Sequence, residues 1–360
     1  MKILVVSGAF YPSNSPRSFR TTELVKRFCK LGHDVTVYIP YTGKDLSLFV
    51  QDYPVNICYY KEKTLKPNSN NNLLRRIWYR LIIQFFEYPS IYLLSSLPKA
   101  LREEHGYDLL ITIGAPHPIH WAVGKMYENG KRLAKTWVAD CGDPYMFGGT
   151  NQYKHPFYFA KQEKRWCREC GYISVPVETA FNGYYPEFRD KIRLIPQAFN
   201  FDEVKLLTYV KNEVPTFAFS GNLVPKVRDP RPFLDYMSSL DIDFKFILYC
   251  SKPHLVTPYK EKLGDKIEIH DYIPRLELLK KLSTMDFLVD FVLVSENQRS
   301  SKLIDYTLTK RPILSINTLE MDTTMVDDFL NGDYTRQLVL PDIEKYNIVN
   351  VANQFIGLCQ

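Results

Sequence analysis

The sequence lacks any long run of apolar residues. A membrane-spanning helix needs about 20 of them, whereas the stretch LIIQFFEYPSIYLL at residues 81–94 is interrupted by Gln84, Glu87 and Pro89. The opening MKILVVSGAF has only four consecutive apolar residues, too few for the core of a signal peptide. We therefore expect a cytoplasmic protein that does not cross a membrane.

The chain also has only a small net positive charge and few cysteines. The net charge is +6 for 360 residues and no long run of lysine or arginine occurs, so nucleic acid is not an expected partner. Seven cysteines are scattered along the chain, an odd number that indicates reduced thiols rather than a disulfide framework. Cys167 and Cys170 in WCREC lack a second CxxC or HxxxH, so we interpret them as two positions of one helix rather than half of a zinc site.

The sequence does contain a repeated alternation of strand and helix patterns. The run KILVV at residues 2–6, a helical pattern that Gly32 ends, and the run DVTVYIP at residues 34–40 form a βαβ unit, which predicts a parallel sheet. The pattern restarts at TFAFSGN after a polar linker at residues 205–213. At about 150 residues per domain, a chain of 360 residues fits two domains.

We therefore predict an α/β protein with two doubly wound domains in tandem, residues 1–205 and 206–345, and a C-terminal helix at residues 346–360 whose packing partner the sequence does not identify. Two such domains are expected to face an interdomain cleft at the carboxyl ends of their strands, where open α/β sheets bind ligands. No GxGxxG motif follows an expected strand, so an oxidoreductase with a nicotinamide cofactor has little support.

The segment SSKLIDYTLTKRPILSI, residues 300–316, reads as a short helix followed by a buried strand. Ser301 and Asp305 are four residues apart and share one face of the helix. That face also has the free N–H groups and positive dipole of the helix start, together with Lys302. This combination suits a phosphate with a diol attached, as in a nucleotide.

A second phosphate-binding pattern occurs in FSGNLVPKVRDPRP, where a strand ends at Gly221 and Lys226 and Arg228 follow. Glycine lets a backbone approach a ligand, and guanidinium offers forked donors to phosphate oxygens. A solvated basic loop is the alternative, but two such loops at one sheet edge are able to hold one diphosphate. Tyr272 and Ile273 of HDYIP follow a third strand and are candidates for a slot that binds the base.

The first half presents acids at a strand end. Asp140 and Asp143 flank a glycine in ADCGDPY, and His117 in GAPHPIH follows a neighbouring strand. Carboxylates in such loops orient or deprotonate a hydroxyl, although Asp143 also suits a turn before Pro144. A metal held by these three residues lacks a spacing signature, and we predict no metal.

Together these segments resemble the family 4 glycosyltransferases of the GT-B fold. SSKLIDYTLTKRPILSI is similar to the family's PSKLFEYLAAGKPVL, and FSGNLVPKVRDP to YAGTLYPGRDP. IGAPHP, ADCGDP and IPQAFN follow family segments in the correct order, as does GHDVTV near the start. The resemblance spans nearly the whole chain and implies two Rossmann-like domains.

The resemblance implies transfer of a sugar, such as a hexose, from a nucleotide diphosphate to an acceptor hydroxyl, with retained anomeric configuration and without a metal or other cofactor. Carried over by position, Asp305 takes the place of the ribose-binding acid, while Asp140, Asp143 and His117 position the acceptor or the sugar. The implied diphosphate-binding residues are Gly221, Lys226, Arg228, Ser301 and Lys302.

Three positions depart from the family pattern. Asn297 stands where many members have an acid near the donor sugar, with Glu296 one residue off register. Lys310 replaces the glycine that often ends the helix, and we expect a left-handed lysine that costs roughly 1 kcal/mol. The frequent Gly-Gly pair after the first strand is Gly8-Ala9 here.

The helical pattern LLRRIWYRLIIQFFEY at residues 73–88 offers a clue to the acceptor. Arg75, Arg76 and Arg80, with aromatic residues nearby, suit an anionic membrane surface. Packing of the same apolar stripe into the core is the alternative. We hypothesise a lipid-linked saccharide acceptor, as in assembly of bacterial surface polysaccharide, and a peripheral position at the inner face of the membrane.

Other functions stay open at this stage. An inverting transferase and a nucleotide-sugar epimerase also use the GT-B fold. A nucleotide-sugar-binding protein without catalysis is a further alternative, because Asn297 replaces an acid.

Overall fold

The computed structural model describes residues 1–13, 15–63, 73–147, 155–225, 228–250, 253–292 and 302–359, with side chains in the helix Leu73–Phe86 described from Arg76 onward. The chain divides into two compact units, Met1–Phe199 with Lys345–Gln360, and Asn200–Glu344. Several residues singled out from the sequence lie outside the described residues: the side chain of Arg75, and Lys226, Glu296, Asn297 and Ser301.

Within the described residues, the first unit contains a seven-stranded parallel sheet in the order β3-β2-β1-β4-β5-β6-β7. The strands are β1 (Lys2–Ser7), β2 (Asp34–Pro40), β3 (Val55–Tyr60), β4 (Tyr107–Ile113), β5 (Ala134–Asp140), β6 (Tyr172–Val175) and β7 (Ile192–Leu194). The helices of this unit are α1 (Pro16–Lys30), α2 (Ser47–Asp52), α3 (Leu73–Phe86), α4 (Leu93–Ala100), α5 (Pro118–Glu128), α6 (Ala160–Glu169) and α12 (Ile348–Gly357).

Local sequence explains where α1 begins and ends. Ser15 caps the helix by accepting a hydrogen bond from the backbone N–H of Ser18, and Pro16 occupies the first helical position. Gly32 follows the helix with a φ of +76°, as its sequence predicts. Leu24 and Phe28 on the inner face of α1 are fully buried.

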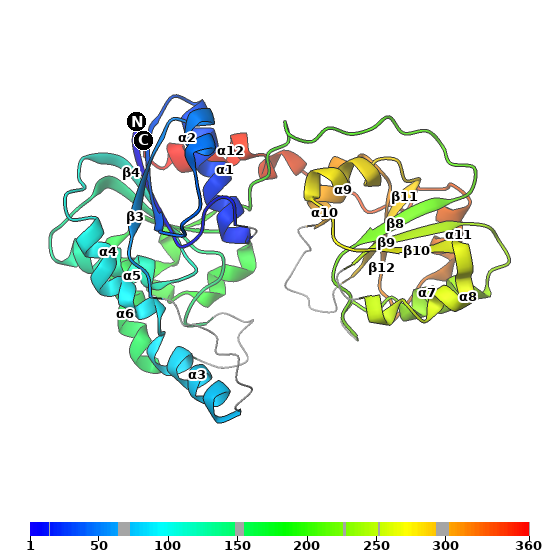
Figure 1. Cartoon of the computed structure of the whole chain (residues 1–360), viewed down its shortest axis with the longest axis horizontal. Coiled ribbons are helices and arrows are strands. Elements are labelled where there is room, and N and C mark those ends of the chain that lie inside the picture. Colours follow the sequence, from blue (N-terminus) through cyan, green and yellow to red (C-terminus); the bar gives the residue numbers. More distant parts are fainter. Residues whose placement is uncertain are drawn as a thin grey trace. The chain divides into compact units, whose positions relative to one another are not determined.

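The C-terminal helix α12 packs against α1 of the first unit (Figure 1). Phe355 is fully buried there and belongs to the same apolar cluster as Leu24 and Phe28. The sequence did not identify this partner. The end of the chain thus completes the core of the unit in which the chain begins.

The described part of the second unit contains a five-stranded parallel sheet in the order β10-β9-β8-β11-β12. Its strands are β8 (Thr216–Ser220), β9 (Lys245–Tyr249), β10 (Ile267–His270), β11 (Phe287–Phe291) and β12 (Ile313–Ile316). Its helices are α7 (Arg231–Ser239), α8 (Tyr259–Leu263), α9 (Arg275–Leu282), α10 (Lys302–Leu308) and α11 (Thr323–Leu330).

Both sheets reverse their strand order once, between β1 and β4 in the first unit and between β8 and β11 in the second. The loops that leave such a pair of strands diverge to opposite faces and expose the carboxyl ends of the strands. A ligand site is therefore expected at the ends of β1 and β4, and at the ends of β8 and β11.

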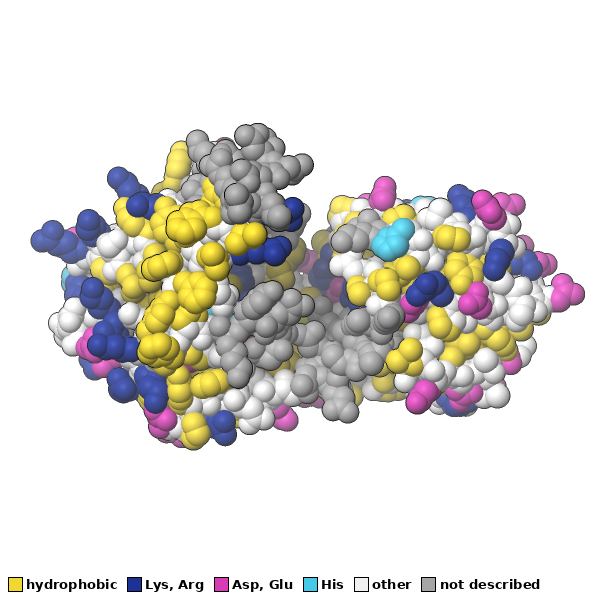
Figure 2. All heavy atoms as spheres, turned by 90° about the horizontal axis from the view of Figure 1, so that it is seen from below, with side chains coloured by type: hydrophobic (Ala, Val, Ile, Leu, Met, Phe, Trp, Pro, Cys, Tyr) yellow, Lys and Arg dark blue, Asp and Glu magenta, His cyan; other side chains and the backbone are white. Residues whose placement is uncertain are grey.

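Helix α3 does not bury its apolar residues, so the core-packing alternative is not what the structure shows. Trp78 is 62% exposed and Phe86 is 65% exposed, and no described side chain of α3 belongs to a hydrophobic core cluster. Figure 2 shows hydrophobic side chains gathered on one face of the first unit, with Lys and Arg side chains beside them. No helix among the described residues is long and apolar enough to span a membrane.

Candidate active site

The second unit places a lysine against a glycine turn where β8 ends. Gly221 follows the strand with a φ of +148°, a conformation that residues with side chains rarely adopt. A Cβ atom there would lie 1.4 Å from Nζ of Lys302. Nζ donates a hydrogen bond of 2.7 Å to the carbonyl oxygen of Ser220. The ammonium group therefore occupies the space that the glycine leaves free.

Lys302 is the first residue of α10, and its side chain is largely buried. Burial and, to a smaller extent, the positive charge of Arg228 lower the pKa of Lys302 to about 8, while Asp290 opposes both effects. Asp290 lies on β11 and is 5% exposed. An anion bound beside the ammonium would offset both the burial and the repulsion, because it favours the charged form.

Arg228 lies close to Lys302 and is 7% exposed. Its Nε donates a hydrogen bond of 3.1 Å to the carbonyl oxygen of Phe291, the last residue of β11. Two backbone hydrogen bonds, of 2.8 and 3.1 Å, pair Arg228 with Val224. The structure thus brings together three of the five residues predicted to bind a diphosphate, Gly221, Arg228 and Lys302, at the point where the strand order reverses.

Asp305 lies one turn after Lys302 on α10 and is paired with Arg275, the first residue of α9. Nη2 and Nε of Arg275 both donate to Oδ1 of Asp305, at 2.6 and 2.9 Å. Burial raises the pKa of Asp305, and Arg275 opposes that rise. A ribose diol that reaches Asp305 must therefore share the carboxylate with Arg275.

The two residues predicted for the base lie in the loop between β10 and α9. The side chain of Tyr272 is 61% exposed, whereas Ile273 packs against the apolar cluster that contains Leu278 and Leu282. The loop thus offers one exposed aromatic face and one apolar edge.

Two of the departures from the family pattern are visible in the backbone. Lys310 has a φ of +58°, which confirms the prediction of a left-handed lysine after α10. A Cβ on Gly8 would lie 2.5 Å from Cδ of Pro116, so the glycine allows the loops after β1 and β4 to touch.

Asp140, at the end of β5, is engaged in a buried ion pair. Nε and Nη2 of Arg20 donate to its two carboxylate oxygens at 3.2 and 2.9 Å, and the Ser174 hydroxyl donates to Oδ1 at 2.7 Å. Desolvation raises the pKa of Asp140, but Arg20, Arg17 and Ser174 together outweigh it, so the pKa is lowered. Because both oxygens are bonded and Asp140 is 2% exposed, this geometry does not suit the predicted contact with an acceptor hydroxyl. Asp140 instead holds α1 to the sheet.

Asp143 and His117 lie together in neighbouring loops of the first unit. Asp143 is exposed, and its backbone receives a hydrogen bond from the His117 imidazole. Burial lowers the pKa of His117 to about 4, with a smaller contribution from Arg17, so the ring is neutral at pH 7. The metal site considered from Asp140, Asp143 and His117 does not fit, because Arg20 already occupies the Asp140 carboxylate.

Sequence reasoning missed Arg17, Arg20 and Arg275. A signal existed for Arg20, which lies four residues before Leu24 and eight before Phe28 and so shares their buried stripe. An arginine in such a stripe indicates a buried acidic partner. For Arg275 no pattern pointed to Asp305.

Two Rossmann-like parallel α/β units in one chain, each with its strand order reversing once, constitute the GT-B fold, as predicted. The chain is similar to the structures of Anabaena Alr3699/HepE in complex with UDP (10% identity, TM-score 0.60), the lipopolysaccharide outer core galactosyltransferase WaaB (11%, 0.56) and UDP-GlcNAc 2-epimerase from Neisseria meningitidis (12%, 0.56), in each case over 99% of both chains. No protein-family model and no curated protein matches the sequence.

Proposed function

We propose that the protein is a glycosyltransferase that moves a sugar from a nucleotide-diphosphate sugar to an acceptor hydroxyl. The observation that carries the proposal is the pair of cations, Arg228 and Lys302, held against the glycine turn after β8. In the reaction the bond from the anomeric carbon to the diphosphate breaks and a bond to the acceptor oxygen forms. Negative charge grows on the leaving diphosphate, and fixed cations stabilise that charge in the transition state.

A uridine nucleotide is the first donor to test. One similar structure contains UDP, and another contains UDP-GlcNAc. Tyr272 and Ile273 are proposed to contact the base, and Asp305 the ribose. A hexose is the proposed sugar, because WaaB, whose structure is similar, is a galactosyltransferase.

The resemblance to family 4 supports retention of the anomeric configuration and a diphosphate held by the protein's own cations instead of a metal. In that mechanism the acceptor proton passes to the departing phosphate oxygen, so no strong external base is required. A mechanism without a strong base suits the first unit, because the Asp140 carboxylate is already paired with Arg20. Asp143 and His117 are the proposed acceptor-positioning residues.

A lipid-linked acceptor is proposed from the exposed surface around α3. An apolar hollow there is lined by Trp78, Leu81, Ile82, Phe85, Phe86 and Tyr158. The hydroxyl of Tyr158 donates to the carbonyl oxygen of Phe85 and so links the loop that contains Tyr158 to α3. The neighbouring Phe157 is 86% exposed. Arg76 and Arg80 are exposed on the same helix. Apolar residues beside arginines suit the boundary of an anionic bilayer, where a saccharide for surface polysaccharide would be presented.

The donor proposal is tested by thermal-shift titration with a panel of nucleoside diphosphates, followed by mass spectrometry of products from the matching nucleotide sugar. A ligand at 100 times its Kd stabilises by about 2.7 kcal/mol. Arg228→Ala should weaken UDP binding far more than UMP binding. Arg231→Ala is the matched control, because Arg231 is half-exposed and paired with Asp229. Equal losses for UDP and UMP in Arg228→Ala would contradict the assignment.

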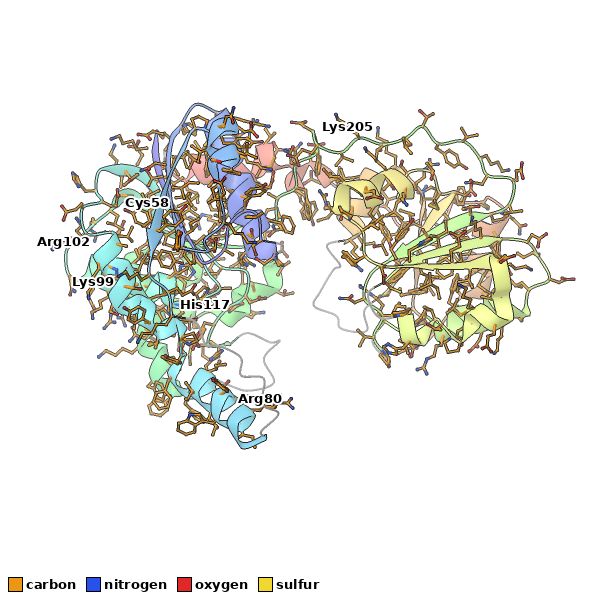
Figure 3. The ribbon with its side chains drawn as sticks, viewed as in Figure 1. Cys58, Arg80, Lys99, Arg102, His117 and Lys205 are labelled. Atoms are coloured by element: carbon orange, nitrogen blue, oxygen red, sulfur yellow. The ribbon has the colours of Figure 1, made fainter. Side chains whose placement is uncertain are left out.

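The membrane proposal is tested by co-sedimentation with anionic and neutral liposomes. Each arginine near an anionic surface contributes about 1 kcal/mol, so Arg76→Glu with Arg80→Glu should weaken binding to anionic liposomes at least roughly 30-fold. The control is Lys99→Glu with Arg102→Glu, an equal change of charge on exposed residues outside α3 (Figure 3). Equal binding by the two double variants, or no binding by the unmodified protein, would refute the proposal.

A nucleotide-sugar epimerase is the second candidate, because a UDP-GlcNAc 2-epimerase is similar to this chain over 99% of both chains. An epimerase converts a nucleotide sugar without an acceptor. Formation of an epimeric nucleotide sugar in the absence of any acceptor would favour it over a transferase.

A further inference from the structure

A cluster of two histidines and one cysteine lies at the carboxyl ends of β4 and β5. The candidate ligand atoms of His117, His120 and Cys141 all lie within 4.8 Å of one another. Sγ of Cys141 is 3.4 Å from Nε2 of His120. Around a tetrahedral Zn²⁺, with bonds of about 2.0 Å to nitrogen and 2.3 Å to sulfur, such atoms lie about 3.5 Å apart. His120 and Cys141 therefore already have the spacing of zinc ligands.

The remaining nitrogen of each histidine has a partner that orients the ring. Nδ1 of His120 lies 2.7 Å from Oγ1 of Thr112, and Oγ1 also accepts a hydrogen bond of 2.9 Å from Nε1 of Trp137. A threonine hydroxyl oxygen has two lone pairs, so both contacts are compatible with the tautomer of His120 that carries its proton on Nδ1. In that tautomer, Nε2 of His120 faces Cys141 with its lone pair. Metal-binding histidines are held by outer hydrogen bonds of this kind.

His117 has the complementary arrangement. Its imidazole donates to the backbone of Asp143, while its Nδ1 is buried without a hydrogen-bond partner. Nδ1 is therefore the nitrogen of His117 whose lone pair is available to a ligand. A buried nitrogen without a partner costs roughly 1–3 kcal/mol, and a metal ion at this position would satisfy it.

Solvent access also permits an ion here, and the Cys141 thiolate would supply the negative charge. His120 and Cys141 are fully buried, but His117 is partly exposed and lies at the edge of the first unit from which α3 projects (Figure 3). The charged groups nearby are the Asp140 carboxylate and the guanidinium groups of Arg17 and Arg20. Burial raises the pKa of the Cys141 thiol, and the neighbouring Tyr184 hydroxyl opposes that rise to a smaller extent.

We propose that Nδ1 of His117, Nε2 of His120 and Sγ of Cys141 bind one Zn²⁺ ion, with the fourth position open to a water molecule. When the ion binds, the thiol proton of Cys141 is released to solvent and the thiolate sulfur coordinates the ion. The ion ties the loop before α5 to the loop after β5. The proposal does not depend on the transferase assignment, and no step of sugar transfer is assigned to the metal.

The test begins with the full-length protein freed of metal by a chelator. Titration with Zn²⁺ against a chromogenic competitor should show one equivalent bound per chain. Co²⁺ should give d–d bands of a tetrahedral site and a charge-transfer band from the thiolate. A protein that binds no equivalent of Zn²⁺, or a Co²⁺ complex without the thiolate band, would overturn the proposal.

Variants distinguish this site from other thiols and imidazoles. Cys141→Ala should abolish the thiolate band and lower Zn²⁺ affinity at least 100-fold, and His117→Ala should lower the affinity with less effect on folding, because His117 is partly exposed. Cys250→Ala is the control, a buried cysteine of the second unit, and should bind as the unmodified protein does. If Cys141→Ala does not fold, the Co²⁺ spectrum of the unmodified protein and the Zn²⁺ affinity of His117→Ala test the site instead. Unchanged affinity in His117→Ala and Cys141→Ala would refute the site.

Discussion

Lys302 is expected to make diphosphate binding depend on pH in a range where an exposed lysine does not titrate. Burial, reinforced by Arg228, lowers its pKa from the ordinary value of 10.5 to about 8. Only the ammonium form attracts a diphosphate. With a pKa of about 8, the charged fraction is roughly 90% at pH 7 and roughly 10% at pH 9, so the apparent affinity for UDP should fall about ninefold over that interval.

The effect on folding has the opposite sign. The pKa of Lys302 lies below its value in the unfolded chain, so the cost of burying the charge is fully present below pH 8. It disappears as the pH rises from about 8 towards 10.5. A rise in pH thus increases the folding stability of the free protein, while it lowers the affinity for UDP. Binding of UDP near pH 8.5 should be accompanied by uptake of a proton.

Isothermal titration calorimetry at pH 7, 8 and 9, in buffers with different ionisation enthalpies, measures both the affinity and the proton uptake. Lys302→Met keeps the length of the side chain without the charge and should bind UDP weakly at all three values. Arg231→Ala should retain the unmodified profile. Equal affinity of the unmodified protein at pH 7 and pH 9, or a steep profile that persists in Lys302→Met, would refute the reasoning.

Three further predictions concern single positions. Gly221→Ala should reduce UDP affinity at least tenfold by calorimetry, because the new Cβ would lie 1.4 Å from Nζ of Lys302 and must displace it; unchanged affinity would show that the ammonium is not needed where it stands. Lys310→Gly should raise Tm by roughly 2–4 °C for a gain of about 1 kcal/mol, whereas Gly332→Ala, at a φ of +83°, should lower Tm; shifts in the same direction would contradict the backbone argument. Asp140→Asn should destabilise by about 3–5 kcal/mol in denaturant unfolding of the first unit, because it leaves Arg20 buried without its counter-ion, and a loss below 1 kcal/mol would contradict the ion pair's role.

The fold was predictable because most strands of the sheets are short apolar runs with a turn or helix signal on either side, although β3 (Val55–Tyr60) is not such a run and was not predicted. The same logic explains why Gly221, Arg228 and Lys302 were correctly grouped. Carboxyl ends of parallel strands share one edge, so residues far apart in sequence meet there whatever the side chains are. Grouping these three residues required only the parallel topology of the sheet, and no knowledge of side-chain contacts.

Roles that depend on a specific partner were not predictable in the same way. Asp140 lies at a strand end, as a catalytic acid would, but its chemistry is decided by Arg20, 120 residues earlier in the chain. Periodicity likewise identified the apolar stripe of α3 without indicating whether protein or lipid covers it. A stripe of that width suits either environment, and the exposure of residues such as Trp78 shows only that it is not packed into the described core.

His117 connects the two proposals for the first unit. Its Nδ1 has one lone pair, so the same atom cannot both ligate Zn²⁺ and accept a hydrogen bond from an acceptor hydroxyl. If the ion is bound during turnover, Asp143 alone of the predicted acids and bases remains to position the acceptor. His117→Gln should raise KM for the acceptor only in the zinc-free protein, where Nδ1 is available to the acceptor, whereas Asp143→Asn should raise it with or without the ion. A KM for the acceptor that is unchanged in Asp143→Asn, in both metal states, would place acceptor recognition elsewhere in the unit.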